Sequence, residues 1–333
     1  MMLVSFWLLF MPAHRYASLD VKHGRVEKSL SCPNWCFLYF KIQFAIVYFF
    51  AATAKIYPDW LAAKPVKIWL SYKTHYPVVG GLFEYDWFPY VITYGGIAFD
   101  ALVIPMLLFR KTRMLAVILS LVFHVFNSAV FQIGIFPYFA LAVAVFFFEP
   151  ETIRKRFFPK KPAFISSLKS IVENKAIPII FLVYFIIQIA LPLRHHFIPG
   201  NVLWDEAGHR LSWRMMLRSK AGNCTFNVEK KDGSKIKVYS QNFMARHQIR
   251  DVSTRPDMLY RAMDYLKEFL VEEGIEAKGI YCDCRVGVNG RRMTTFVDPK
   301  FNMLNAEWNY FGQQEWIAEE PDMGWESVKE KKK

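Results

Sequence analysis

The apolar residues of this chain are massed in blocks as long as a membrane span, rather than scattered with the period of a soluble fold. Each clear block carries at most two Lys, Arg, Asp or Glu residues. The blocks are 35–57, 92–109, 114–148 and 177–193, with a shorter one at 2–13. This pattern predicts an integral membrane protein.

The block 114–148 is too long for one span. Its middle, QIGIFPY, contains Gly134 and Pro137, which predict two helices joined by a tight turn. The opening stretch lacks the basic start and small-residue cleavage site of a signal peptide, so we interpret it as a genuine span. The chain should then have five or six membrane segments.

Beyond residue 200 the periodicity changes. Two segments alternate as paired strands do around an Asp-Gly or Asn-Gly turn, and one has the spacing of an amphipathic helix. These are 224–240 with Asp232-Gly233, 277–298 with Asn289-Gly290, and 255–274, which ends at Gly274. We therefore expect a multi-pass α-helical membrane protein, with transmembrane residues 1–200 and a small extracytoplasmic α+β domain at 201–333.

The charge distribution predicts the orientation. Of 42 Lys+Arg and 29 Asp+Glu, residues 205–333 hold 22 and 20, so the first 204 residues hold 20 and 9. The basic excess gathers beside the apolar blocks, near 22–28, 110–113 and 154–175. Short basic loops of this kind are cytoplasmic under the positive-inside rule, which explains the charge better than nucleic-acid binding does.

With those loops in the cytoplasm, the successive spans place residues 194–333 outside it. Lys55 and the aromatic segment 58–91 fall on the same side as the C-terminal domain. That compartment is oxidising, which bears on the five cysteines. Cys32/Cys36 and Cys282/Cys284 lack partners at metal-ligand spacing, so we predict no metal and favour ordinary thiols. A disulfide involving Cys224, Cys282 or Cys284 stays open.

Lys55 ends the block 35–57 and has two interpretations. It can be an interfacial anchor that extends its amine to water, with Lys41 anchoring the opposite end. It can instead lie in a pocket poor in water, where burial favours the uncharged amine that serves as a base.

Other polar residues interrupt the spans. Asp100 lies near the middle of 92–109, where a carboxylate would not face lipid. His124 and Asn127 have i,i+3 spacing on one helical face, with Ser128 beside them. Polar pairing inside a helix bundle and a functional pocket both explain these residues. The chain has no Walker loop, GxGxxG, GxSxG or HExxH, so any chemistry would use lysine and histidine in an apolar pocket, which suits a lipid-soluble reactant.

Several segments resemble the vitamin K-dependent γ-glutamyl carboxylases and their bacterial relatives, which share the HTTM domain. The resemblance covers residues 10 to about 312, and its most specific parts are the His-Asn-Ser and Ser-Trp-x-Met-Met segments. The segments are MPAHRYASLD, QFAIVYFFAATAKIYPDW, GGIAFD, FHVFNSAVFQIGIFPY, LSWRMMLRS and IYCDCRVGVNGR…VDP. Helices that precede these motifs in the family have no counterpart here, so we expect a bacterial-type, N-terminally short member.

The resemblance implies an enzyme that oxidises reduced vitamin K, a naphthoquinol, with O2 to the epoxide and uses the resulting strong base to carboxylate glutamate with CO2. Lys55 matches the lysine proposed to deprotonate the quinol. His124, Asn127 and Asp100 would line or support the pocket, and Trp213 would enter from the extracytoplasmic side. The implied partners are the lipid bilayer, the quinol and a glutamate-containing peptide, with no nucleic acid.

The chain also departs from the animal enzymes. They have two adjacent lysines where this chain has Ala54-Lys55, and histidines where an ungapped register places Val26 and Ser31. Two alternatives therefore stay open. One is quinol oxidation or epoxidation without carboxylation, and the other is a non-catalytic membrane protein that binds a lipid or a partner.

Overall fold

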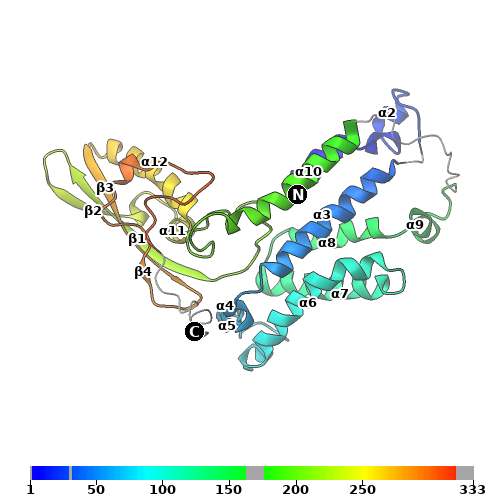
Figure 1. The fold of residues 1–333 in the computed structure, drawn as a ribbon, viewed down its shortest axis with the longest axis horizontal. Helices are drawn as coiled ribbons and strands as arrows, with labels where there is room; N and C mark the ends of the chain where they lie inside the picture. Colours follow the sequence, from blue (N-terminus) through cyan, green and yellow to red (C-terminus); the bar gives the residue numbers. More distant parts are fainter. Residues whose placement is uncertain (1, 30–31, 163–175, 320–333) are drawn as a thin grey trace. The chain divides into compact units, whose positions relative to one another are not determined.

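The structure is a computed structural model that describes residues 2–29, 32–162 and 176–319 (Figure 1). The basic stretch 163–175 expected in a cytoplasmic loop, and Ser31, lie outside these residues. The chain forms two compact units, each assembled from two stretches of sequence. The first unit is Met1–Phe49 with Ala98–Gln188, and the second is Phe50–Ile97 with Ile189–Lys333.

Apolar helices form the first unit. The long ones are α3 (Asn34–Thr53), α6 (Phe88–Leu108), α7 (Arg113–Phe126) and α10 (Ala176–Leu193), of which α3, α6 and α10 continue into the second unit. The short ones are α1 (Met2–Leu8), α2 (Leu19–Lys22), α8 (Phe136–Val143) and α9 (Pro150–Phe157).

Within the described residues, four helices are long and apolar enough to cross a membrane, and five if one bent helix pair counts as a span. The four are Asn34–Thr53, Phe88–Leu108, Arg113–Phe131 and Ile179–His196, and the pair is Phe136–Phe147 with Pro150–Phe157. The prediction of a multi-pass helical membrane protein is confirmed. The opening stretch forms only the seven-residue α1.

The predicted break inside 114–148 is present. After α7 the chain passes through a π-helical turn, Asn127–Phe131, and then reverses before α8. Gln132 and Gly134 adopt positive φ values of 52° and 67° at this reversal. The left-handed conformation is easiest for glycine, which explains the turn signal in the sequence.

Polar side chains join α3 to α10 inside the first unit. Tyr184 donates a hydrogen bond to Gln43 Oε1 (2.6 Å), and Gln43 Nε2 lies 3.5 Å from Gln188 Oε1. Both glutamines are buried, so these bonds satisfy groups that would be costly in an apolar setting. Aromatic rings also pack between the helices of this unit. Phe40 and Phe146 are stacked, with 3.9 Å between their centroids.

The second unit contains an antiparallel sheet of order β2-β1-β3-β4. Its strands are β1 (Lys220–Lys230), β2 (Lys235–Tyr239), β3 (Ala277–Val288) and β4 (Thr294–Thr295), and its helices α11 (Arg246–Thr254), α12 (Pro256–Glu272), α4 (Pro58–Leu61) and α5 (Lys64–Ser71). Both predicted hairpins and the predicted helix are confirmed. Asn289 and Gly290 have φ values of 53° and 81°, as the tight turn requires.

Helix α12 packs its apolar face on this sheet. Leu259, Ala262 and Leu266 are fully buried there against Phe226 and Ile280 of the strands. Burial of one such side chain stabilises a fold by about 1.5–3 kcal/mol, so this contact gives the C-terminal domain a core of its own.

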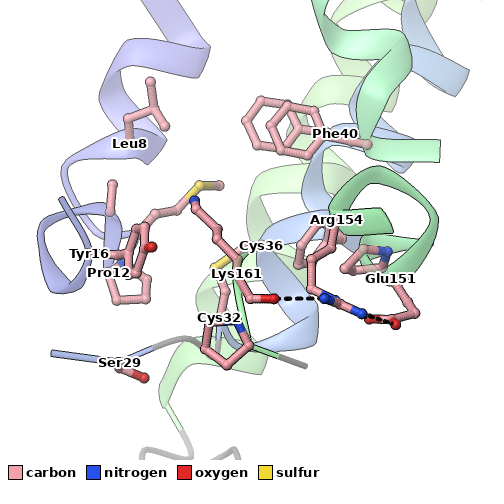
Figure 2. Close-up of a pocket in the computed structure, with 16 residues that line it drawn as sticks. Leu8, Pro12, Tyr16, Ser29, Cys32, Cys36, Phe40, Glu151, Arg154 and Lys161 are labelled. Atoms are coloured by element: carbon pink, nitrogen blue, oxygen red, sulfur yellow. Dashed lines mark hydrogen bonds and ion pairs between the residues drawn. The ribbon is translucent and has the colours of Figure 1, made fainter. Parts of the chain in front are cut away.

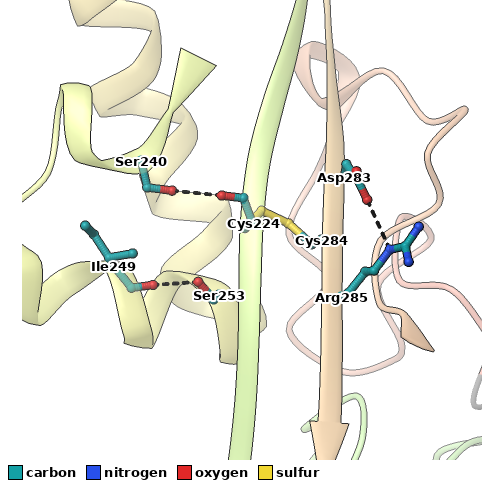
Figure 3. The surroundings of a disulfide bond; sticks show 7 residues. All are labelled: Cys224, Ser240, Ile249, Ser253, Asp283, Cys284 and Arg285. Carbon is teal, nitrogen blue, oxygen red and sulfur yellow. Dashed lines mark hydrogen bonds and ion pairs between the residues drawn. A yellow bond between two sulfur atoms is a disulfide. The ribbon is translucent and has the colours of Figure 1, made fainter. Parts of the chain in front are cut away.

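A disulfide links the two central strands. Cys224 of β1 lies directly opposite Cys284 of β3 in the sheet register, and their sulfurs are bonded (Figure 3). The disulfide that the sequence left open is therefore present, and the preference for an ordinary thiol is wrong for Cys284. Antiparallel register brings these residues, 60 positions apart, into contact. Cys282 is buried two residues along the same strand, and the three sulfurs lie within 4.8 Å of one another.

Candidate active site

Lys55 lies just beyond the end of α3 and is buried in protein, with 9% of its surface exposed. Its Nζ donates a hydrogen bond to the carbonyl of Ala51 at 3.0 Å. The same nitrogen lies 5.7 Å from the ring centroid of Trp60. The amine therefore turns back onto its own helix end and an aromatic ring instead of extending to water.

The sequence after Lys55 explains this placement. Pro58 cannot continue α3 but is well suited to begin α4, so the chain turns at Tyr57, which is extended. A second reversal follows at Ala63, whose φ is 56°. The short helix between these turns carries Trp60, which is 4% exposed, onto the Lys55 amine.

Asp59 fixes the turn to the C-terminal domain. Its side chain is 2% exposed. Both guanidinium ends of Arg291 donate to it, with Nη2 2.9 Å from Oδ1, while Asn289 Nδ2 donates to Oδ2 at 2.9 Å. Lys64 Nζ adds an ion pair at 2.9 Å. Burial alone would raise the pKa of Asp59, but hydrogen bonds from Arg291, Asn289 and Lys64 outweigh it and lower that pKa below its usual range.

Tyr57 makes a second link between the turn and the same domain. Its hydroxyl donates to the carbonyl of Leu217, and Asn289 Nδ2 lies 3.5 Å from that hydroxyl. Asn289 Oδ1 in turn accepts the backbone N–H of Ser219 at 2.9 Å. Burial raises the pKa of Tyr57 to about 12, so the phenol stays a donor at neutral pH. These bonds hold the residues after Lys55 against the C-terminal domain.

Trp213 lies in a segment with unusual backbone geometry. Leu211, Trp213 and Met216 all have positive φ, at 59°, 54° and 48°. Non-glycine residues in this region cost of order 1–3 kcal/mol each, and such strain clusters at functional sites. The Trp213 Nε1 is buried and has no hydrogen-bond partner within the described residues. A strained loop with an unused donor is a reasonable place for a ligand.

Cations surround this loop. Arg214 Nη1 donates to His195 Nε2 at 3.2 Å, whereas its Nε is buried without a partner in the described part of the chain. Burial lowers the pKa of Arg214 to about 10. Arg218 pairs with the buried Glu206 at 2.5 Å, and its Nη1 lies 3.4 Å from Nδ1 of His209. Burial, with help from Arg218, lowers the pKa of His209 to about 3.

The first unit contains the other predicted residues. His124 is 2% exposed, and its Nε2 shares a 2.9 Å hydrogen bond with the hydroxyl of Tyr48. The rings of Phe99, Phe123 and Phe136 surround the imidazole, with centroids at 5.7, 5.3 and 6.1 Å. His124 therefore sits in an aromatic cage with one hydroxyl partner.

Asp100 and Asn127 belong to the same unit. Asp100 follows Phe99 on α6 and is 6% exposed. Asn127 is half-buried and opens the π-helical turn after α7, a distortion that often marks functional sites. Ser128 bonds the hydroxyl of Tyr138 at 2.8 Å. Of the positions compared with the animal enzymes, Val26 is half-buried in the loop after α2.

The structure thus adds residues to the predicted set. In the first unit it brings Tyr48 to His124, and in the second unit it brings Asn289 and Arg291 to Asp59, four residues after Lys55. Tyr48 had a detectable signal, because it precedes Lys55 by seven residues and lies two helical turns away on the same face. The link between Asp59 and Arg291 joins residues 232 positions apart, which no local pattern indicates.

Comparison with known families agrees with this geometry. Residues 1–151 match the HTTM domain, and residues 173–323 match the lumenal domain of vitamin K-dependent γ-carboxylase. No solved structure matches the chain. These domains define a multi-pass membrane protein of carboxylase type, with the sheet domain corresponding to the lumenal part.

The chain belongs to the vitamin K-dependent γ-carboxylase family. The function is therefore carboxylase-like, and the membership indicates an enzyme that uses reduced vitamin K, O2 and CO2.

Proposed function

We propose that the protein is a membrane enzyme that couples oxygenation of a vitamin K-type quinol to carboxylation of glutamate, with Lys55 as the base. The observation that carries the proposal is the buried Lys55 amine, 5.7 Å from the Trp60 ring and held by a turn that Asp59 and Arg291 fix. A lysine that only anchored a helix would place its charge in water.

The surroundings of Lys55 fit an apolar, ring-shaped reactant. Trp60 provides an aromatic face, and its Nε1 is buried with no partner in the described residues. Trp213 offers a second unused Nε1 donor. Such donors can bind the oxygens of a quinol, whose oxygenation supplies the strong base for glutamate.

Lys55 would act by accepting a proton at Nζ from a quinol hydroxyl. The Ala51 carbonyl, at 3.0 Å, stabilises the ammonium that forms, and the Trp60 face adds a cation–π attraction. Trp60 also packs near the amine, which is buried with the rest of the Lys55 side chain. Asp59 and Arg291 act as positioning residues that hold this turn.

His124, Asn127 and Asp100 are proposed to support quinol binding within the first unit. The Tyr48 hydroxyl fixes the orientation of the His124 ring, because it bonds Nε2 at 2.9 Å. The aromatic cage around this histidine suits a naphthoquinol better than a charged substrate.

The orientation that we propose places the sheet domain outside the cytoplasm. The basic loops near 22–28 and 110–113 support it under the positive-inside rule. The disulfide between Cys224 and Cys284 supports it independently, because such bonds persist in oxidising compartments.

Quinol turnover tests the role of Lys55. In the purified protein in lipid nanodiscs, Lys55→Ala should lower epoxide formation at least 100-fold. Lys67→Ala, which removes a lysine whose Nζ rests on Tyr90, should leave it unchanged. Equal epoxide formation by wild type and Lys55→Ala would refute the assignment.

A second function has one observation in its favour. The single lysine of Ala54-Lys55 and the presence of Val26 in place of a histidine depart from the animal enzymes, which favours quinol oxygenation without carboxylation. Incorporation of labelled CO2 into a glutamyl peptide separates the two reactions. A protein with neither quinol turnover nor CO2 incorporation would instead be a non-catalytic binding protein.

A further inference from the structure

A cavity of about 650 Å³ lies within the first unit, and none of the candidate site residues lines it (Figure 2). Its walls come from α1, the start of α3, α9 and the connecting segments around Tyr16 and Lys161. Most of the lining is apolar, and it includes Leu8, Phe37 and the stacked Phe40.

Two lysines supply positive charge near Tyr16, a residue that lines this cavity: Lys161 belongs to the lining itself, and the exposed Lys28 lies outside it. Lys161 Nζ lies 4.2 Å from the ring centroid of Tyr16, and Lys28 Nζ lies 5.4 Å from the same ring. Neither lysine has an acidic partner among the described residues. Two ammonium groups near one aromatic ring make this end of the cavity positive, which favours an anion there.

The nearby arginine does not remove this charge. Arg154 forms a two-pronged bond with Glu151, at 2.8 and 2.6 Å, and the two charges cancel. Its third contact, from Nη1 to the Lys161 carbonyl at 2.6 Å, holds the Lys161 segment against α9, as Figure 2 shows. The cavity end therefore keeps the positive charge of Lys161 in its lining, and that of Lys28 beside Tyr16.

The position of the cavity along α3 relates it to the bilayer. This helix begins at Asn34, and the lining residues Cys36, Phe37 and Phe40 belong to its first two turns. At 1.5 Å per residue the cavity reaches about 9 Å into the span from its end. With α3 as a membrane span, we expect the lysines at the level of lipid headgroups and the phenylalanines at the level of acyl chains.

We propose that this cavity binds one anionic phospholipid, with its phosphate at Lys28 and Lys161 and an acyl chain against Phe37 and Phe40. A neutral lipid would gain nothing from the two lysines, and a free phosphate would gain nothing from the apolar wall. Basic pockets of this type between membrane helices bind acidic headgroups. The site is independent of quinol chemistry.

Lipid binding to the purified full-length chain tests the proposal. Thermal stabilisation is measured while palmitoyl-oleoyl phosphatidylglycerol is added, and phosphatidylcholine with the same chains is the comparison. We expect at least tenfold tighter binding of phosphatidylglycerol. Lys28→Gln and Lys161→Gln should each weaken it about fivefold, since a lysine near a membrane surface contributes about that factor.

Two neighbouring lysines provide matched controls. Lys22→Gln and Lys160→Gln remove the same charge from neighbouring residues that neither line the cavity nor lie over the Tyr16 ring, and should change binding less than twofold. Unchanged melting in phosphatidylcholine shows that each variant folds. An equal loss in all four variants would overturn the proposal in favour of general attraction to anionic membranes. Equal stabilisation by inorganic phosphate alone would overturn the requirement for an acyl chain.

Discussion

The most quantitative prediction concerns the contact between Asp59 and Arg291. In Asp59→Asn, Arg291 loses the charge to which it donates two hydrogen bonds, and in Arg291→Gln a carboxylate that is 2% exposed loses its main partner. Breaking a buried pair from one side costs about 3–5 kcal/mol. Because 22% of the Arg291 side chain is exposed, we expect the lower end, about 3 kcal/mol.

Hydrogen exchange of the backbone amides at residues 57–64 measures this cost locally. A loss of about 3 kcal/mol corresponds to roughly 100-fold faster exchange of this turn. Lys64→Gln is the matched control, because the Lys64 amine contacts the same carboxylate but its side chain is 46% exposed. We expect this variant to destabilise the turn by less than 1 kcal/mol. Quinol turnover should fall with exchange protection in Asp59→Asn, since the turn carries Trp60 onto Lys55.

A double-mutant cycle provides the refutation. If Asp59→Asn and Arg291→Gln act through one contact, the double variant should lose clearly less stability than the summed losses of the two single variants. Strict additivity would show that the pair does not hold the turn. The effect should also be constant from pH 5 to 8. A carboxyl whose folded-state pKa is lowered contributes fully above its unfolded pKa and loses that contribution only as the pH falls through the lowered value.

Three further predictions concern other parts of the chain. Burial holds the pKa of His209 near 3, so below about pH 6.5 the unfolded chain binds a proton that the folded chain does not. The free energy of unfolding should therefore fall by up to about 1.4 kcal/mol per pH unit toward pH 3. Thermal unfolding of His209→Gln should lack this pH dependence. Replacing Cys224 and Cys284 by serine should lower the free energy of unfolding by about 2–4 kcal/mol. In thermal unfolding, a reductant should destabilise the wild type to the same extent and leave the variant unchanged. Tyr48→Phe leaves the buried His124 without its hydroxyl partner and should lower stability by about 1–3 kcal/mol in thermal unfolding, while a loss below 0.5 kcal/mol would show that the bond contributes little.

Much of the fold was predictable because its signals are local. The membrane helices follow from apolar length, and the reversal near Gly134 and the two hairpins follow from glycines that tolerate positive φ. Helix α11 was not predicted, because RHQIRDVST has few apolar positions and is stabilised by packing on β1 and α12. Tertiary contact decides such segments, not intrinsic propensity.

The candidate site was predictable only in part. The position of Lys55 at a helix end is visible in the sequence, but whether its amine reaches water or turns inward depends on Trp60 and on the turn that Asp59 fixes. Arg291, which lies far along the chain, stabilises that turn, so no local sequence pattern predicts where the amine points. The burial of Lys55 removes the interpretation as a water-reaching anchor, and its catalytic role stays a proposal.

The bond between Cys224 and Cys284 also closes the intervening chain into a covalent ring. Strand β2 and helices α11 and α12 all lie inside that ring. A protease that cuts any one peptide bond between the two cysteines leaves both fragments attached, so the helical layer cannot be shed from the sheet by a single cleavage. The domain that carries Asn289 and Arg291 thereby survives such a cut in one piece, until a reductant opens the ring.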